Sequence, residues 1–564
     1  MNTKIFSPFW LLFSGFLLSL AWMLPNHTPP WLAFHSDAWS ATVLTVVGLG
    51  VLWKSSVTPR WQVLTITASL FCLVPWLQFA LGLTLSFGTA WINSIYLLGF
   101  LFAIQTGEAW ALQSPEQPAD FVFIAVLIAA AISTGLQIFQ WMGLGSSSPW
   151  ILNVTGQSRF YANMAQPNQL ASLLLLGLLG CSWGVYRDKL NATFAILTAC
   201  FLLIGVALTE SRTAWVNLVF LGLGAIVWRK KLPSIRHLWV VMGLGVYFIA
   251  CVAMLPLLVS LTDSGATLEY RPLVDHARLN AWKMLFDASL QRPLAGFGWG
   301  QLASANFLVI ENYPGQPGLF TQSHNLILDL ILWNGYPLGL LAVVVVGWWI
   351  WKVISLARSF SQIHLVAFVM ILGTHAMLEF PLQYAFFLLP FGLVAGALHT
   401  NLGFQPVFKN KQWVQIAIAA LAMLFLAITI RDYFRVETSF YGLRFENRKI
   451  VTDIPSTPPD VIVLSQFRDH LLFARNVPRG NVESRELNWM VDTVTTLPSA
   501  HVMYKLASNL ALNQRTDEAQ KWLLRMCKTA PAPNCQVMKL SWEKESLLNA
   551  RMAAVDWPEE FMRD

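Results

Sequence analysis

Charged residues are scarce in this sequence: Asp, Glu, Lys and Arg together make up 12% of its 564 positions. A soluble domain has about twice that share. Hydrophobic residues make up 55% of the chain, and the mean hydropathy is +0.53. Apolar runs of bilayer-spanning length recur from Pro8 to about Arg431, which predicts an all-α polytopic membrane protein with about 13 transmembrane helices. The predicted spans are roughly 8–24, 38–54, 62–83, 88–106, 121–142, 168–186, 192–209, 214–228, 237–260, 325–351, 363–379, 384–400 and 412–431.

Several functional motifs are also missing from the sequence. It has no Walker A motif, which argues against an ATP-driven pump. The outer loops have no carboxylate-rich DxD pattern, which argues against a metal-dependent nucleotide-sugar enzyme. No Cys-x-x-Cys motif or His/Cys cluster suggests zinc. We therefore expect neither a metal nor a cofactor, and the net charge of +7 does not argue for nucleic acid because Lys and Arg follow the membrane topology.

The distribution of Lys and Arg assigns the two sides of the membrane. The basic loops alternate with loops that hold few cations, which places the N-terminus inside and the tail from Asp432 outside. The loop at 107–120 breaks this pattern, because it has several acids and no Lys or Arg. The first span has no small-residue cleavage site before Pro25, which predicts a retained anchor. The inside loops contain Lys54 and Arg60, Arg187 and Lys189, Arg229 to Arg236, Lys352 and Arg358, and Lys409 and Lys411.

The pattern divides the chain into four parts: transmembrane helices in 1–260, a large outer loop in 261–324, further transmembrane helices in 325–431, and a tail in 432–564. Within the tail, Tyr504 to Pro531 has the small/large spacing of one tetratricopeptide-like unit. A simple helical hairpin is the preferred interpretation, because a repeat fold needs about three units. Cys527 and Cys535 bracket a short segment of the tail and are candidates for a disulfide in an oxidising compartment.

Polar side chains gather on the outer side of the predicted spans. Such residues are costly near membrane depth and are functional candidates by default. If the helices bundle, these residues could line one outward-opening cavity. They are Arg159, Tyr161, Gln166 and Asn168; Glu210, Ser211 and Arg212; Arg278 and His324; and His375, Glu379, Gln383 and Tyr384.

Arg212 lies between two apolar spans in a very short loop. One interpretation is that it extends toward lipid headgroups or pairs with Glu210. The other is a phosphate clamp, because a guanidinium is permanently charged and matches phosphate oxygens in bidentate fashion.

The outer loop contains a predicted amphipathic helix at the membrane interface. Its basic residues Arg278 and Lys283 are placed to meet anionic groups. The apolar positions at helical spacing are Ala281, Trp282, Leu285, Phe286 and Leu290.

His324 stands directly before the long apolar run of 325–351. It belongs either to a helix cap, with Ser323 or Asn325 bonding the first free N–H groups, or to a catalytic site as a general base near neutral pH. Asp329 lies five residues on and is a poor candidate to orient the ring. The Gly335-Tyr336-Pro337 sequence predicts a break in the helix.

Four segments carry a resemblance to a known group. "SHNLILDLILWNGYPLG" and "TESRTAWV" resemble the O-antigen ligase/polymerase (WaaL/Wzy) superfamily. "FYANMAQPNQLASLLLLGL" and "HAMLEFPLQYAFFLLPFGLVAGAL" are similar to the PglL-type protein O-oligosaccharyltransferases, including those that glycosylate pilins. The resemblance covers most of the membrane region and is weaker in the tail. Gln169 departs from the pattern, because His is expected there in many relatives.

The resemblance implies a reaction, a location and roles for the candidate residues. An oligosaccharide would move from undecaprenyl pyrophosphate to Ser or Thr of pilin or another periplasmic protein, at the outer face of a Gram-negative inner membrane. His324 would handle the acceptor hydroxyl, while Arg212 and Arg278 would stabilise the departing phosphate. The implied reaction inverts the anomeric carbon and needs no metal. The substrate-binding candidates are Gln166, Asn168, Tyr384, Arg159 and Lys283.

Two other functions remain open on the sequence. A lipopolysaccharide O-antigen ligase would use the same kind of donor and pass the glycan to lipid A-core. A transporter of lipid-linked glycans would show internal repeats and polar residues at the bilayer midplane. The polar residues here lie at the outer rim, which favours an enzyme.

Overall fold

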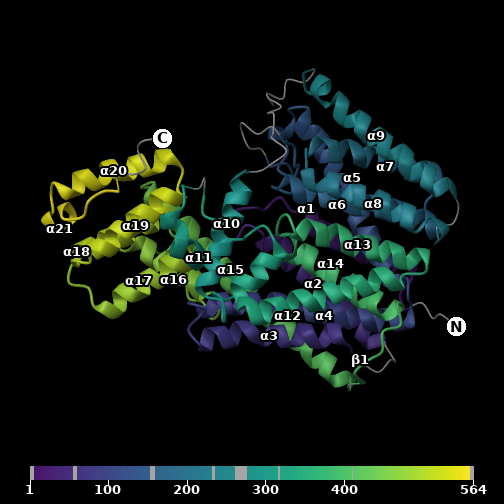
Figure 1. Cartoon of the computed structure of the whole chain (residues 1–564), viewed down its shortest axis with the longest axis horizontal. Helices are drawn as coiled ribbons and strands as arrows, with labels where there is room; N and C mark the ends of the chain where they lie inside the picture. Colours follow the sequence, from purple (N-terminus) through teal and green to yellow (C-terminus); the bar gives the residue numbers. More distant parts are fainter. Residues whose placement is uncertain are drawn as a thin grey trace. The chain divides into compact units, whose positions relative to one another are not determined.

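A computed structural model describes residues 5–54, 60–152, 159–231, 235–260, 276–315, 318–409 and 411–558. Almost all of its regular structure is α-helical, which confirms the predicted class (Figure 1). Within the described ranges the only strands are β1 (Arg60–Trp61) and β2 (Phe408–Lys409), which pair antiparallel. Residues 261–275 and 316–317 of the predicted outer loop lie outside the described residues.

Every predicted span corresponds to a helix, and most ends agree within a few residues. Among the described residues, eight helices are long and apolar enough to cross a membrane: α2 (Phe34–Lys54), α3 (Val63–Ala80), α4 (Phe87–Gln113), α5 (Gln117–Trp141), α6 (Pro167–Tyr186), α9 (Ile235–Ser260), α12 (Leu326–Leu356) and α15 (Gln412–Asn447). Five apolar helices are shorter: α1 (Pro8–Met23), α7 (Ala192–Leu208), α8 (Arg212–Val227), α13 (Phe360–Ala376) and α14 (Ala385–Asn401). The predicted end of the last span at 431 is too early, because α15 continues into the tail as far as Asn447.

The chain forms two compact units, each built from three segments. Unit 1 comprises Met1–Leu70, Tyr96–Pro272 and Val346–Leu426, and unit 2 comprises Phe71–Ile95, Leu273–Val345 and Ala427–Asp564. In unit 1 the helices form a closed ring of neighbours: α1 packs on α5, α5 on α6, α6 on α13, α13 on α14, α14 on α2, and α2 on α1. The core of this ring includes the fully buried side chains of Phe121, Leu174, Phe368 and Leu393.

The acidic loop at 107–120 is neutralised by a cation from another loop. Glu116 and Asp120 lie at the N-terminal end of α5, where carboxylates are favoured by the helix dipole. Arg187, just after α6, donates through Nε to Asp120 Oδ1 across 2.9 Å and also pairs with Glu116. Two of the three acids in this loop are therefore balanced by a basic residue of the loop that the sequence places on the same side, and the third, Glu108, accepts from Gln62 Nε2.

In unit 2 the predicted break in α12 is present and is used for packing. Gly335 interrupts α12 with a φ of 71°, and Gly296 has a φ of 67° in the turn that follows α10 (His276–Gln291). The two backbones approach so closely that a Cβ at either glycine would overlap the other segment. The Phe297 N–H donates to the Leu332 carbonyl across 2.7 Å, so carbonyl groups near the break bond to the turn.

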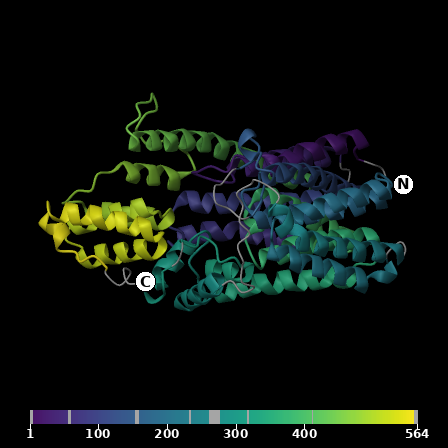
Figure 2. The same cartoon turned by 90° about the horizontal axis from the view of Figure 1, so that it is seen from above.

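The tail is an array of helices in which each packs on the next, with its C-terminal members coloured yellow in Figure 2. The predicted hairpin of 504–531 is confirmed as part of α18 and α19, but it belongs to a longer array than a single hairpin. Cys527 and Cys535 form the predicted disulfide. The array consists of α16 (Ser465–Arg475), α17 (Ser484–Thr496), α18 (Ala500–Leu512), α19 (Thr516–Thr529), α20 (Ala532–Ser546) and α21 (Ala550–Ala553).

A buried lysine joins this array to the outer-loop segment of unit 2. Lys528 is 4% exposed, and its ammonium group donates to three backbone carbonyls around η3 (Ile310–Asn312). The three distances from Nζ are 3.1 Å to Ile310, 2.6 Å to Glu311 and 2.8 Å to Tyr313. Arg525 adds an ion pair with Glu311 at 3.0 Å. A buried ammonium group is stable only with such hydrogen-bond partners, so this contact fixes Lys528 against the three carbonyls.

Candidate active site

The predicted site residues fall into two groups, one in each unit. Each group includes segments with left-handed turns. Among the eight described non-glycine residues with positive φ, four occur in the segments that the sequence marks as functional. Such conformations cost about 1–3 kcal/mol each and cluster at functional sites. The four are Ala162 (φ 53°), Ala165 (φ 59°), Glu210 (φ 47°) and His324 (φ 58°).

The backbone around His324 is held by side chains from two helices. Asp329 of α12 accepts from the Ser323 N–H across 2.9 Å, and Trp282 of α10 donates through Nε1 to the Ser323 carbonyl across 2.7 Å. The ring of Phe320 lies edge-on to the half-buried imidazole, with centroids 6.1 Å apart. Asp329 thus supports the peptide unit before His324, a role that its sequence position did not reveal.

The helix-cap interpretation applies to Asn325. Its side-chain oxygen accepts from the N–H groups of Ile327 and Leu328, at 3.0 and 3.1 Å, and so satisfies the start of α12. His324 directly precedes this cap, so the cap helps to fix the position of the imidazole.

Helix α10 presents the two predicted cations of unit 2. Arg278 is half-buried and Lys283 is exposed. Ala281, Met284, Leu285 and Ala288 form a buried stripe along α10, which confirms an amphipathic helix. Phe286 and Leu290 are 51% and 52% exposed, and their place at the membrane interface stays a prediction.

Asn168 is the centre of the polar network in unit 1. Its carbonyl oxygen accepts from Arg159 Nη2 at 3.0 Å and from Ser211 Oγ at 2.8 Å, while its amide donates to Glu379 Oε1 at 2.9 Å. Arg159 also donates through Nε to the Thr209 carbonyl at 2.8 Å. The structure thus brings Arg159 and Asn168 together with the side chains of Ser211 and Glu379 from two other segments. Within the described ranges, no three His, Cys, Asp or Glu side chains gather as a metal site requires.

Arg212 is the first residue of α8 and is exposed. Ser211 caps this helix by accepting from the Ala214 N–H and joins the network by donating to Asn168. A helix N-terminus carries partial positive charge and favours anions. A cation at this position combines with the helix end into a locally positive surface that suits a phosphate.

Tyr384 and Gln166 are linked through Gln169. Gln166 caps α6 by accepting from the Gln169 N–H at 2.7 Å. The Gln169 side chain is 4% exposed and lies beside the Tyr384 hydroxyl. The glutamine that departs from the expected pattern is therefore a neighbour of a predicted substrate-binding tyrosine.

Asp37 belongs to the same neighbourhood and was missed by the sequence reasoning. It is 5% exposed in the first turn of α2. Its carboxylate accepts from the Tyr96 hydroxyl at 2.5 Å and from the Ala385 N–H at 2.6 Å, directly after Tyr384. The predicted span began at 38, one residue too late to mark Asp37 as a carboxylate at membrane depth. A span predicted to begin slightly earlier would have included Asp37 among the costly polar residues near membrane depth.

Comparisons with known proteins identify the family of the chain. Three family models match consecutive parts of the chain: protein glycosylation ligase at 161–183, O-antigen ligase at 197–343, and the C-terminal region of virulence factor membrane-bound polymerase at 363–539. A general O-oligosaccharyltransferase from Acinetobacter baylyi is 30% identical over 526 residues, which cover 91% of this chain and 90% of the relative. The chain belongs to the O-oligosaccharyltransferase family.

A second relative from the same organism, a ComP-specific O-oligosaccharyltransferase, is 30% identical over 285 residues, or half of each chain. These matches confirm the resemblance inferred from the sequence motifs. The first model covers Asn168, and the second covers Arg212, Arg278 and His324. The third extends from α13 into the helical array of the tail.

Proposed function

We propose that this protein transfers an oligosaccharide en bloc from undecaprenyl pyrophosphate to Ser or Thr of pilin or another periplasmic protein. The observation that carries the proposal is the similarity to a general O-oligosaccharyltransferase along nine-tenths of both chains. The placement of His324 in a left-handed turn held by Asp329 and Trp282 supports it, because that geometry suits a positioned catalytic group.

In this mechanism the acceptor hydroxyl attacks the anomeric carbon of the first sugar. The new bond joins the acceptor oxygen to that carbon, and the bond from the carbon to the diphosphate oxygen breaks. His324 takes or orients the hydroxyl proton, and undecaprenyl pyrophosphate leaves with the bonding electrons. Attack opposite to the leaving group inverts the anomeric centre.

The departing diphosphate requires positive charge, since negative charge accumulates on it as the bond breaks. Arg212 at the N-terminus of α8 and Arg278 on α10 supply this charge in the proposal. Arg159 and Lys283 contribute to binding, together with Gln166, Asn168 and Tyr384. Pyrophosphate is already a good leaving group, so the proposed reaction needs no metal, and activity should persist in a chelator.

The proposed location is the inner membrane of a Gram-negative bacterium, with the tail and site in the periplasm. The distribution of Lys and Arg supports this orientation. The Cys527–Cys535 disulfide supports it independently, because such bonds persist in oxidising compartments. Reporter fusions after Asp432 test the orientation, and a cytoplasmic signal there would overturn it.

The deciding experiment supplies purified full-length protein with a lipid-linked oligosaccharide and one of two acceptors, a pilin or lipid A-core. Transfer to the pilin is expected. The match to the O-antigen ligase model favours lipid A-core as the alternative acceptor. Transfer only to lipid A-core would replace the proposal with an O-antigen ligase, and failure with both acceptors would reject both.

A further inference from the structure

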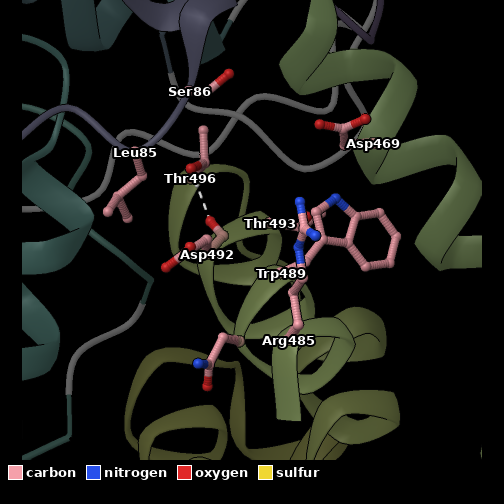
Figure 3. A pocket seen from close by; sticks show the side chains of 9 residues that line it. Leu85, Ser86, Asp469, Arg485, Trp489, Asp492, Thr493 and Thr496 are labelled. Carbon is pink, nitrogen blue, oxygen red and sulfur yellow. Dashed lines mark hydrogen bonds between the residues drawn. The ribbon is translucent and has the colours of Figure 1, made fainter. Parts of the chain in front are cut away.

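Unit 2 contains a cavity of about 530 Å³ that none of the candidate catalytic residues lines (Figure 3). This size falls within the range of about 300–1,000 Å³ that is usual for small-ligand sites. One wall is Leu85 and Ser86, just before α4, and the other wall is formed by α16 and α17 of the tail. The two walls are joined, since Ser465 Oγ accepts from the Gly88 N–H at 3.0 Å.

Most of the tail wall of the cavity is one face of α17, and Asp469 of α16 adds to it. Arg485, Asn488, Trp489 and Asp492 of α17 line it at positions i, i+3, i+4 and i+7, the spacing of one helical face. The opposite face of α17 is anchored in the tail, because Leu487, Met490 and Val494 are buried. Trp489 also packs edge-on against the fully buried Phe473, with centroids 6.3 Å apart, which fixes the indole. The face of α17 that lines the cavity is thus a polar surface with one aromatic ring, on a helix that is anchored by its buried face.

The charges in the cavity favour an uncharged ligand. Arg485 is its one cationic lining residue, whereas Asp469 and Asp492 are both acidic. Asp469 already pairs with Arg468 at 2.9 Å. A diphosphate would meet two carboxylates, which disfavours it, and a purely apolar segment would meet mostly polar groups. Arg485, Asn488 and Asp492 are all exposed, so an incoming ligand can reach them.

A sugar ring matches this mixture of groups. Its hydroxyls donate to carboxylates and accept from guanidinium and amide groups, and its C–H face packs on an indole. We propose that this cavity binds a sugar of the donor glycan other than the one that forms the new bond. The inference rests on the proposed function for the identity of the glycan, and it assigns the tail a share in donor selection.

The test compares two synthetic donors, undecaprenyl pyrophosphate bearing one N-acetylglucosamine and the same lipid bearing chitopentaose. Asn488→Ala and Asp492→Asn should each raise the KM for the pentasaccharide donor roughly three- to tenfold, the effect of one or two lost hydrogen bonds. The KM for the monosaccharide donor should not change. Asp517→Asn, an exposed carboxylate of α19 outside the cavity, is the matched control and should behave as wild type with both donors.

Direct binding is measured on the full-length protein by saturation-transfer difference NMR with free chitopentaose. The signal should fall at least threefold in both cavity variants and persist in Asp517→Asn. Equal signals in all proteins, or an increased KM for the pilin acceptor alone, would overturn the inference. If the wild type transfers neither donor, the proposed function fails, and the NMR comparison still decides whether the cavity binds sugar.

Discussion

The carboxylate of Asp329 accepts a hydrogen bond from the Ser323 N–H across 2.9 Å and so connects the first turn of α12 to the residue before His324. Ser323 and Asp329 are both 1% exposed, so the bond is shielded from competing water. The candidate base therefore sits on a backbone that is tied to a membrane helix rather than on a free loop.

Loss of the acceptor at Asp329 should impair catalysis without removing a catalytic group. Hydrogen bonds to charged groups contribute about 1.5–3 kcal/mol, so Asp329→Ala should lower kcat roughly 10- to 100-fold. Asp329→Asn retains an oxygen at the same place and should remain within about threefold of wild type. Glycan transfer is measured beside size-exclusion profiles. Equal loss in both variants would show that the charge, not the acceptor position, matters.

His324→Asn tests the base itself. Asn tolerates the left-handed backbone at this position, so the turn is preserved while the imidazole is removed. We expect transfer to fall roughly 10²- to 10⁴-fold, the usual contribution of general acid–base catalysis. Thr321→Ala, an exposed neighbour, should leave the rate unchanged. Full activity in His324→Asn would remove the proposed role.

Arg212 should require its guanidinium geometry and not only its charge. Arg212→Ala should abolish transfer, and Arg212→Lys should retain about a tenth or less of the wild-type kcat/KM, because an ammonium cannot bind phosphate in bidentate fashion. Arg278→Ala should also abolish transfer, while Lys230→Ala, an exposed cation of η2 (Arg229–Lys231), should have no effect. Wild-type kinetics in Arg212→Lys would leave only a general electrostatic role.

The tail should lose stability in mild acid. Burial lowers the pKa of His470 and of His501, so the unfolded tail takes up protons near pH 6.5 that the folded tail resists. Stability is therefore lost as the pH falls through about 6.5. Asp492 acts in the opposite sense at lower pH, since burial raises its pKa from 3.8.

Hydrogen exchange of peptides from α16 and α18 in the full-length protein, corrected for intrinsic rates, measures this loss between pH 7.5 and 5.5. His470→Gln should reduce the pH dependence in α16. An identical pH response in the variant and the wild type would contradict the assignment to His470.

Hydropathy and the placement of charges were sufficient to predict the membrane helices, because each one is an apolar run that can be recognised from its own residues. They could not predict where α15 ends, because the polar residues after Arg431 continue the helix without an apolar run. The break at Gly335 was predictable from the Gly-Tyr-Pro sequence. Its close contact with Gly296, 39 positions away, was not, because no local sequence pattern contains it.

The sequence could name candidate site residues by type, but it could not predict the hydrogen bonds between them. Asn168 and Glu379 are separated by 211 positions, so their hydrogen bond follows from the packing of α6 on α13. Asp37 was missed because it lies at the edge of an apolar run, where a charge is not conspicuous. Gln169 was noted only as a departure, and its place beside Tyr384 depends on the fold because the two residues lie far apart in the sequence.

Lys528 and the three carbonyls to which it donates form one contact, and its two sides come from distant parts of the chain. A chimera that exchanges the tail of this protein for that of a relative therefore has to exchange residues 310–313 with it. If the cut is made only at the end of the last membrane span, the new tail faces a backbone shaped for another partner. The tail and this short segment should therefore change together between relatives, although more than 200 residues separate them in sequence.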